Sequence, residues 1–291
     1  MGFEDRMVAN IDRKRKNREE MPRFMIDAHK RAKSEILNNR EYAIQSTDFV
    51  DLYGEKNVEL DMLKVLQLEK KFAKNDKSSF EKNSKMTAEV FEAIVLMHSE
   101  LSEWLGNAHT LKTSRYDDYI NKTDLIAEWQ HEGGTRHLAL AVDVTFGKVA
   151  IEKKMTQIKE EIERDELGEV KYHRSDFDDS RGERKNVPRV VIGISKENVE
   201  QLAQLWMQND NKSLGIHPVQ RVILAEIQMQ LETMKEYAER NGKERAVRAY
   251  ERALNIVEGL HEQKENIPFG DLRDDPVFSE IQHTTERLFE E

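Results

Sequence analysis

The sequence predicts an α+β protein, with a small mixed β-sheet in the middle of the chain and helical segments on both sides of it. The strand signals lie in the middle: residues 125–130 alternate apolar and polar side chains, and residues 138–146 are almost continuously apolar. Gly133 and Gly134 lie between these stretches and favour a tight hairpin turn. Before and after the middle, apolar residues recur at helical spacing.

The composition favours exposed amphipathic helices over a thick core. Of the 291 residues, 38% are hydrophobic and 35% are charged, and the net charge is −10. This charge argues against coating of nucleic acid by the whole molecule, but it is compatible with a local basic groove. The absence of cysteine excludes disulfides and thiolate metal sites. Because no apolar run approaches the ~20 residues of a spanning helix and the N-terminus lacks a signal-peptide core, we expect a cytoplasmic protein.

The chain divides into three predicted parts, which are an N-terminal helical segment, an α/β core and a C-terminal helical hairpin with a tail, at residues 1–82, 83–212 and 213–291. The first part contains the basic run Arg13-Lys14-Arg15-Lys16-Asn17-Arg18, which is typical of phosphate binding, of a targeting signal or of a solvated helix. In the third part, Asn241-Gly242 separates two helical patterns that we expect to pack as an antiparallel hairpin.

The core begins with an amphipathic helix predicted over residues 87–105. His98 falls in the middle of its apolar face, where we expect a hydrogen-bonded core histidine. Glu89 and Glu100 lie at the border of that face and could reach the sheet, whereas Glu92 is expected to point away.

After the hairpin, a helix predicted over residues 149–165 crosses over the sheet. We expect it to bring residues 169–174 or residues 190–195 alongside the hairpin as a parallel strand. Residues 175–186 are predicted to be a charged loop. A further helix is predicted to begin near residue 196.

The turn also predicts how the two hairpin strands pair. If Gly133 and Gly134 are the two turn residues, the numbers of paired residues sum to 267 (132 + 135), and Asp124 lies directly opposite Asp143. Like charges at opposed positions are destabilising unless something neutralises them, and a divalent cation would do so. The alternative is a longer turn with another register, in which both carboxylates end their strands in solvent.

This order of elements over residues 87–207, with Asp124 and Asp143 in the hairpin, resembles the PD-(D/E)XK nuclease superfamily, the fold of many restriction endonucleases. The resemblance implies a restriction-endonuclease-like α-β-β-α-β core. In that family one acid begins a strand of the hairpin, a second lies in the next strand, and a lysine follows two positions later. Asp124 and Asp143 match the two acids, and Glu100, or alternatively Glu89, would be the helical carboxylate that many members add.

The position of the family's lysine holds Thr145. In members with the full motif, that lysine orients the attacking water and stabilises charge on the phosphate. Lys148 follows three residues later and is a candidate for a displaced ammonium group, as are Lys122, Lys153 and Lys154. Because the motif lysine is replaced, the alternative is an inactive descendant that kept only the nuclease fold.

The resemblance implies metal-dependent hydrolysis of phosphodiester bonds in DNA or RNA. Mg²⁺ or Mn²⁺ would be held by Asp124, Asp143 and Glu100, because hard oxygen ligands favour these ions over zinc. His131 and His137, near neighbours in the predicted hairpin, raise zinc as an alternative.

Basic residues outside the motif suggest where nucleic acid could bind. Arg181, Arg184 and Lys185 lie in the predicted charged loop, and the run from Arg13 to Arg18 lies near the N-terminus. The competing hypothesis is a non-catalytic interaction protein, whose helical ends bind a partner or a second copy of the chain as a homo-oligomer.

Overall fold

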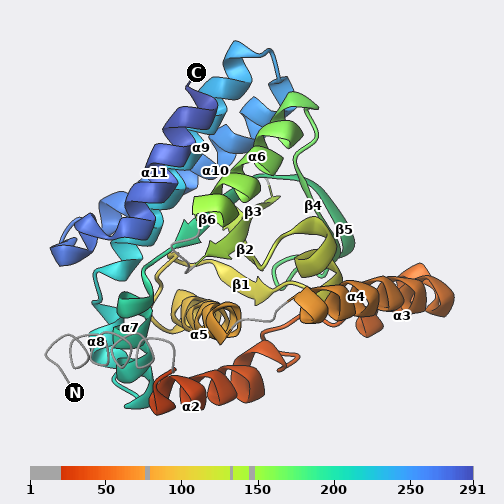
Figure 1. Ribbon diagram of the computed structural model, residues 1–291. Coiled ribbons are helices and arrows are strands. Elements are labelled where there is room, and N and C mark those ends of the chain that lie inside the picture. Colours follow the sequence, from red (N-terminus) through yellow and green to blue (C-terminus); the bar gives the residue numbers. More distant parts are fainter. Residues whose placement is uncertain (1–20, 76–78, 132–133, 144–147, 291) are drawn as a thin grey trace, which may run out of the picture.

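The computed structural model describes residues 21–75, 79–131, 134–143 and 148–290 (Figure 1). It confirms the α+β fold class, because helices surround a four-stranded sheet and a two-stranded sheet lies beside it. In this part of the chain, no helix is sufficiently long and apolar to cross a membrane.

The four-stranded sheet consists of β1 (His109–Lys112), β2 (Leu125–His131), β3 (Gly134–Asp143) and β6 (Arg189–Gly193), in that spatial order. β2 pairs antiparallel with both β1 and β3, and β6 pairs parallel with β3. Helix α6 (Lys148–Glu163) begins the crossover from β3 that leads to β6. The predicted mixed sheet, its antiparallel hairpin and its parallel neighbour are therefore confirmed.

The register of the hairpin differs from the prediction. Paired residues sum to 265, as in Leu125 with Leu140, so the predicted sum of 267 is wrong and Asp124 does not lie opposite Asp143. A shift of two residues leaves the same side chains on each face of a strand. The apolar pattern therefore could not distinguish the two registers.

The two-stranded sheet pairs β4 (Gly168–Arg174) with β5 (Arg181–Val187) in antiparallel fashion. The prediction of a charged loop over residues 175–186 is therefore wrong for its second half. Most side chains of β5 are at least partly exposed, so this strand lacks the apolar alternation by which strands are recognised.

Helices α5 (Ser79–Leu101) and α6 cover opposite faces of the four-stranded sheet. Glu92 of α5 contacts Lys112 of β1, and Glu161 of α6 contacts Arg189 of β6. Lys112 aligns through its partner on β2 with position 140 of β3, and Arg189 aligns with position 139. Because neighbouring positions of a strand belong to opposite faces, Lys112 and Arg189 lie on opposite faces of the sheet, and so do the helices that contact them.

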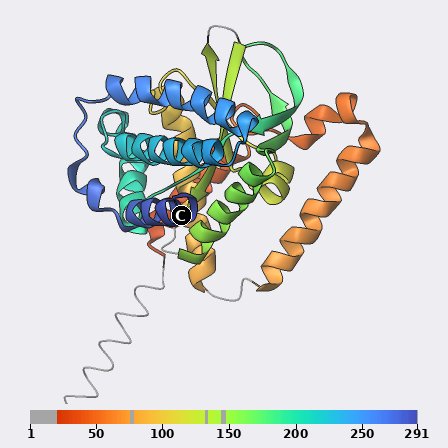
Figure 2. The same ribbon diagram turned by 90° about the horizontal axis from the view of Figure 1, so that it is seen from above.

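Helices from both ends of the chain join a common hydrophobic core, which includes Met25, Phe91, Ile192 and Phe289. The predicted antiparallel helical hairpin is confirmed, since α9 and α10 lie side by side (Figure 2). The remaining helices are α2 (Arg23–Arg31), α3 (Val50–Tyr53), α4 (Glu55–Asn75), α7 (Lys196–Met207), α8 (Asn211–Gly215), α9 (Val219–Arg240), α10 (Glu244–Gln263) and α11 (Pro276–Phe289).

Helix α9 covers the outer edge of β6. Gln230 accepts a hydrogen bond from the Val191 N–H at 2.8 Å and donates one to the Val191 carbonyl at 2.7 Å. Glu226 accepts from the Gly193 N–H at 3.0 Å. These side chains pair backbone groups that an edge strand otherwise leaves unpaired, and they hold β6 beside β3.

Candidate functional site

The two acids predicted from the hairpin lie at the same end of adjacent strands. Asp124 directly precedes β2, and Asp143 is the last residue of β3. In the observed register the position opposite Asp124 is residue 141, because 124 + 141 = 265, so Asp143 is offset by two residues. The side chains of Asp143 and Lys148, and the whole of Thr145, lie outside the described part of the chain.

The two helical carboxylates that were predicted as ligands are engaged with basic side chains. Glu100 Oε1 lies 2.9 Å from His109 Nδ1. Glu89 Oε2 lies 2.5 Å from His29 Nε2, and its Oε1 lies 2.8 Å from Lys33 Nζ. Burial alone would raise the pKa of Glu89, but these two partners lower it to about 2. The role of Glu100 as a metal ligand stays a prediction.

The structure brings Glu92 of α5 to the sheet. The expectation that Glu92 points away is wrong, since the residue is only 6% exposed. Residues 90–96 of α5 are all buried, because α2, α7 and β1 pack around this part of the helix. Glu92 Oε2 lies 2.8 Å from Lys112 Nζ.

Lys112 is held at the edge of the sheet by its backbone and by two carboxylates. Its N–H donates to the Tyr42 carbonyl at 2.8 Å, and its own carbonyl accepts from the Ile44 N–H at 3.0 Å. Its Nζ lies 3.1 Å from Asp118 Oδ2 as well as 2.8 Å from Glu92. The Lys112 side chain is 12% exposed, so the ammonium group is largely withdrawn from water.

Asp118 and one further acid, Asp124, reach this ammonium group from the segment between β1 and β2. Asp118 belongs to the π-helical turn Asp117–Asn121, and Asp117 anchors that turn by accepting two backbone hydrogen bonds from β4, at 2.7 and 3.1 Å. Asp124 is placed next to β1 because the Thr113 N–H donates to the Asp124 carbonyl at 3.1 Å. We call Glu92, Lys112, Asp118 and Asp124 the acidic network.

The acidic network perturbs the titration of its two most buried members, Glu92 and Lys112. Burial, together with the charges of Asp124 and Asp118, raises the pKa of Glu92 to about 7 against the opposing effect of Lys112. Burial lowers the pKa of Lys112, but the carboxylates of Asp118, Glu92 and Asp124 outweigh it and hold that pKa well above its ordinary value. Lys122 also interacts electrostatically with Asp118 and Asp124, and Lys85 interacts with Asp118, so these two carboxylates have cations beside Lys112. Glu92 holds a proton up to neutral pH.

No family model, curated protein or solved structure matches the chain. Inference about function therefore depends on its own residues. Glu92, Asp118 and Asp124 offer only carboxylate oxygens, which are the ligands that Mg²⁺ and Mn²⁺ prefer. The chemical type of these donors suits such an ion, and binding would require the three carboxylates to move closer, because the described group whose ligand atoms already lie within 4.8 Å of one another is Glu128, His137 and His173.

The basic residues proposed for nucleic-acid binding are largely neutralised by neighbours. Arg181 Nη1 lies 2.8 Å from Asp51 Oδ2, and Lys185 Nζ lies 3.0 Å from Glu183 Oε2. Arg184 donates to the Ser180 hydroxyl. The basic run at residues 13–18 lies outside the described part of the chain. Nucleic-acid binding through these residues therefore stays a prediction.

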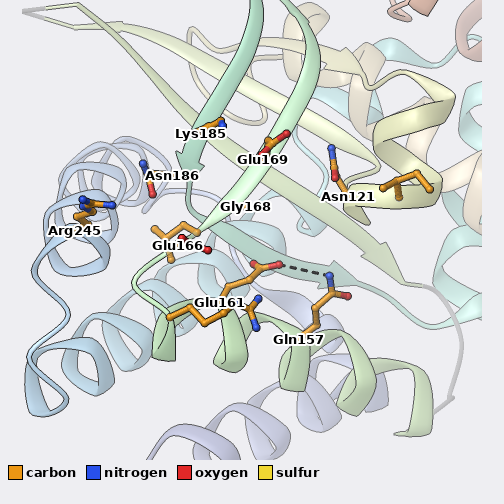
Figure 3. Close-up of a pocket in the computed structure, with 12 residues that line it drawn as sticks. Asn121, Gln157, Glu161, Glu166, Gly168, Glu169, Lys185, Asn186 and Arg245 are labelled. Carbon is orange, nitrogen blue, oxygen red and sulfur yellow. Dashed lines mark hydrogen bonds between the residues drawn. The ribbon is translucent and has the colours of Figure 1, made fainter. Parts of the chain in front are cut away.

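A polar cavity of about 360 Å³ lies between α6, β4, β5 and α10 (Figure 3). Carboxylates and cations alternate around it, so its lining does not favour a polyanion. Asn121, at the end of the π-helical turn that carries Asp118, also contributes to the wall. The other labelled charged and amide side chains are Gln157, Glu161, Glu166, Glu169, Lys185, Asn186 and Arg245.

A second cluster lies on the sheet face opposite Lys112 and consists of Glu128 of β2, His137 of β3 and His173 of β4. The expectation that His131 neighbours His137 is wrong, because His137 pairs with Glu128. Burial would raise the pKa of Glu128, but the hydrogen bond from His137 and the neighbouring imidazole of His173 outweigh it and lower that pKa to about 2. Burial lowers the pKa of His173.

Proposed function

We propose that this chain is a metal-dependent nuclease, in which Glu92, Asp118 and Asp124 of the acidic network hold Mg²⁺ or Mn²⁺. Lys112 supplies the ammonium group that the family motif has at the position of Thr145. The observation that carries this proposal is the acidic network, in which buried Lys112 contacts Glu92 at 2.8 Å and Asp118 at 3.1 Å beside the start of β2. The order α5, β1, β2, β3, α6 along the chain, followed by β6 after the separate pair β4 and β5, supports the proposed nuclease-like core.

The proposed metal ion would polarise a phosphodiester and lower the pKa of a water nucleophile. Lys112 remains protonated throughout the physiological range and can donate hydrogen bonds to a phosphate oxygen. Asp118, whose side chain is 30% exposed, marks the side of the network that is open to solvent. Glu92 holds a proton up to about pH 7 and must release it before its carboxylate can bind a cation.

Titration calorimetry with Mn²⁺ tests the proposal, together with cleavage assays on single-stranded DNA, duplex DNA and RNA. The wild-type chain should bind Mn²⁺ saturably and cut at least one substrate in a Mn²⁺-dependent or Mg²⁺-dependent manner. Asp124→Asn should weaken Mn²⁺ binding at least 10-fold and abolish cleavage, because it removes a ligand charge. Asp271→Asn is the matched control, since Asp271 is exposed and lies far along the chain in a different element, and it should leave both properties unchanged.

Thr145→Lys extends the same assays to the motif position. If the ammonium group limits the rate, this substitution should raise cleavage in the wild-type background and restore part of the activity in Lys112→Met. Absence of Mn²⁺ binding and of cleavage in the wild-type chain, or equal activity in Asp124→Asn, would contradict the proposed function. Metal binding without cleavage of any substrate would indicate a nuclease fold without the activity.

A second candidate function is a non-catalytic interaction protein, which the surface of α4 favours. This helix lies at the edge of the molecule (Figure 2). It exposes large apolar side chains, including Leu60 at 47% and Leu63 at 52%. Exposed apolar surface of this kind is typical of sites where another protein binds. In that case Asp124→Asn should leave partner binding unchanged, while the acidic network would serve only to join α5 to β1.

A further inference from the structure

The cluster of Glu128, His137 and His173 joins both sheets of the protein. Glu128 and His137 are paired neighbours on β2 and β3 of the four-stranded sheet, and His173 comes from β4 of the two-stranded sheet. His137 Nε2 lies 3.0 Å from Glu128 Oε1, and His173 Nε2 lies 3.5 Å from the same oxygen. The two imidazole rings meet edge to face, with centroids 4.9 Å apart.

His173 is buried without adequate hydrogen bonds. It is 0% exposed, and within the described residues neither of its ring nitrogens has a hydrogen-bond partner. Its Nε2 is aimed at Glu128, but 3.5 Å is too long for a well-formed bond. A buried polar group left in this state costs about 1–3 kcal/mol, so the ring is expected to have a partner that the protein itself does not supply.

The path of β4 is what turns His173 inward. Pairing between β4 and β5 is irregular between Val170 and His173. The consecutive residues Tyr172 and His173 are both fully buried, Tyr172 against Phe49 and His173 against the sheet. Irregularities of this kind re-aim side chains, and they are over-represented beside functional sites.

The ligand atoms suit a transition-metal ion rather than Mg²⁺. One carboxylate oxygen and two imidazole nitrogens lie within 4.8 Å of one another. Ligands at about 2.0–2.2 Å from one tetrahedral ion are about 3.3–3.6 Å apart, so the donors need to shift by only about 1 Å to share an ion. Two histidines and a glutamate are a ligand set of zinc sites that keep a fourth position for water.

A small cavity gives access to this cluster from solvent. It has a volume of about 160 Å³, and His137 forms part of its wall together with Arg136, Arg184 and Arg252. His137 is also the most exposed of the three side chains, at 15%. The cavity thus provides room for a water or an anion beside His137, at a fourth coordination position.

We propose that Glu128, His137 and His173 bind one divalent transition-metal ion of the zinc class, which fastens β4 to the four-stranded sheet. This site is independent of the proposed nuclease function. Its histidine ligands differ in kind from the carboxylates of the acidic network, and Glu128 and His137 lie on the sheet face opposite Lys112.

Titration of the chelator-treated full-length chain with Co²⁺ tests the proposal, followed by competition with Zn²⁺. One equivalent of Co²⁺ should produce the intense visible absorption of a four-coordinate or five-coordinate ion, and one equivalent of Zn²⁺ should remove it. His173→Gln and Glu128→Gln should each weaken Zn²⁺ binding at least 10-fold. His283→Gln, at an exposed position of α11, is the matched control and should bind Zn²⁺ within 2-fold of the wild-type chain.

The Co²⁺ spectrum of the wild-type chain tests the proposed site even if a variant fails to fold. Absence of saturable Co²⁺ and Zn²⁺ binding by the wild-type chain would overturn the proposal, as would equal Zn²⁺ affinity in a folded His173→Gln variant. Asp124→Asn should retain Zn²⁺ binding, because Asp124 is not a ligand of this site. If Asp124→Asn loses Mn²⁺ binding but retains Zn²⁺ binding, the two sites are independent, so either proposal can fail without the other.

Discussion

Replacing Lys112 with methionine removes an ammonium group that contacts both Glu92 and Asp118. Lys112 Nζ lies 2.8 Å from Glu92 and 3.1 Å from Asp118, and its side chain is 12% exposed. At about 3 Å and an effective dielectric constant of about 20, each such pair of unit charges interacts by about 5–6 kcal/mol. Relief of the ammonium group's desolvation offsets much of this attraction, and breaking buried pairs by removing one partner costs about 3–5 kcal/mol in measured cases.

We therefore expect Lys112→Met to lower the free energy of unfolding by about 3–5 kcal/mol at pH 8, where the Glu92 carboxyl is ionised. Urea unfolding followed by circular dichroism measures this change. Adding Glu92→Gln to the variant removes one uncompensated charge, so the double variant should recover at least half of the loss. Saturating Mn²⁺ should stabilise Lys112→Met more than the wild-type chain, because the ion replaces the missing positive charge.

Lys64→Met is the matched control, because Lys64 Nζ also contacts a carboxylate, that of Asp61 at 3.0 Å, while its side chain is 57% exposed. Exposed ion pairs contribute only about 0–1 kcal/mol, so this variant should change stability by no more than that. A loss below about 1 kcal/mol in Lys112→Met, or no recovery on adding Glu92→Gln, would refute the charge-balance reasoning.

Two further substitutions test the site and the fold. Since the folded-state pKa of Glu92 is raised from 4.5 to about 7, its contribution to stability is complete below pH 4.5 and is lost as pH rises through 7. Between these values the unfolding free energy of the wild-type chain should fall, relative to that of Glu92→Gln, by roughly 1 kcal/mol per pH unit. Urea unfolding from pH 5 to 8 measures this difference. A difference that does not change with pH would contradict the expectation, as would the same pH trend between the wild-type chain and the exposed control Glu258→Gln. Gln230→Ala should lower stability by about 2–5 kcal/mol, because two buried backbone groups of Val191 lose their partners, whereas Gln228→Ala, which breaks a bond within α9, should cost under about 1 kcal/mol. Equal melting temperatures for the Gln230→Ala and Gln228→Ala variants would argue against a role of Gln230 in holding β6.

The sequence alone was sufficient to predict the helices and strands that have strong periodic patterns of apolar residues. The hairpin, the crossover helix and the α9–α10 pair follow from alternation, from β-branched runs and from helical spacing, and these signals reflect burial of one or both faces. Strand β1 has only four residues, which is too short for a period to be recognised, and β5 is too polar. Both strands are fixed by tertiary pairing, which a single sequence does not display.

The candidate site was harder to predict than the fold. Asp124 was found because it begins a recognisable strand, but Lys112 lies on the strand that was missed. Glu92 was placed on the exposed side because a helix with one apolar face was assumed, whereas α5 is buried around its whole circumference at that point. His173 is turned inward by an irregularity in β4, for which the sequence offers no periodic signal.

Stability does not account for the acidic network. Elsewhere α5 packs through apolar side chains such as Phe91 and Ile94, and replacing a buried ionic group by apolar residues is often neutral or stabilising. In the network, burial together with the carboxylates of Asp124 and Asp118 outweighs the effect of Lys112, so that Glu92 retains a proton up to neutral pH. A cation can bind the Glu92 carboxylate only after this proton leaves. The proposed metal site therefore predicts that Mn²⁺ binding releases a proton near neutral pH, which titration calorimetry in buffers of different ionisation enthalpy would detect. A purely structural link between α5 and β1 predicts no such release.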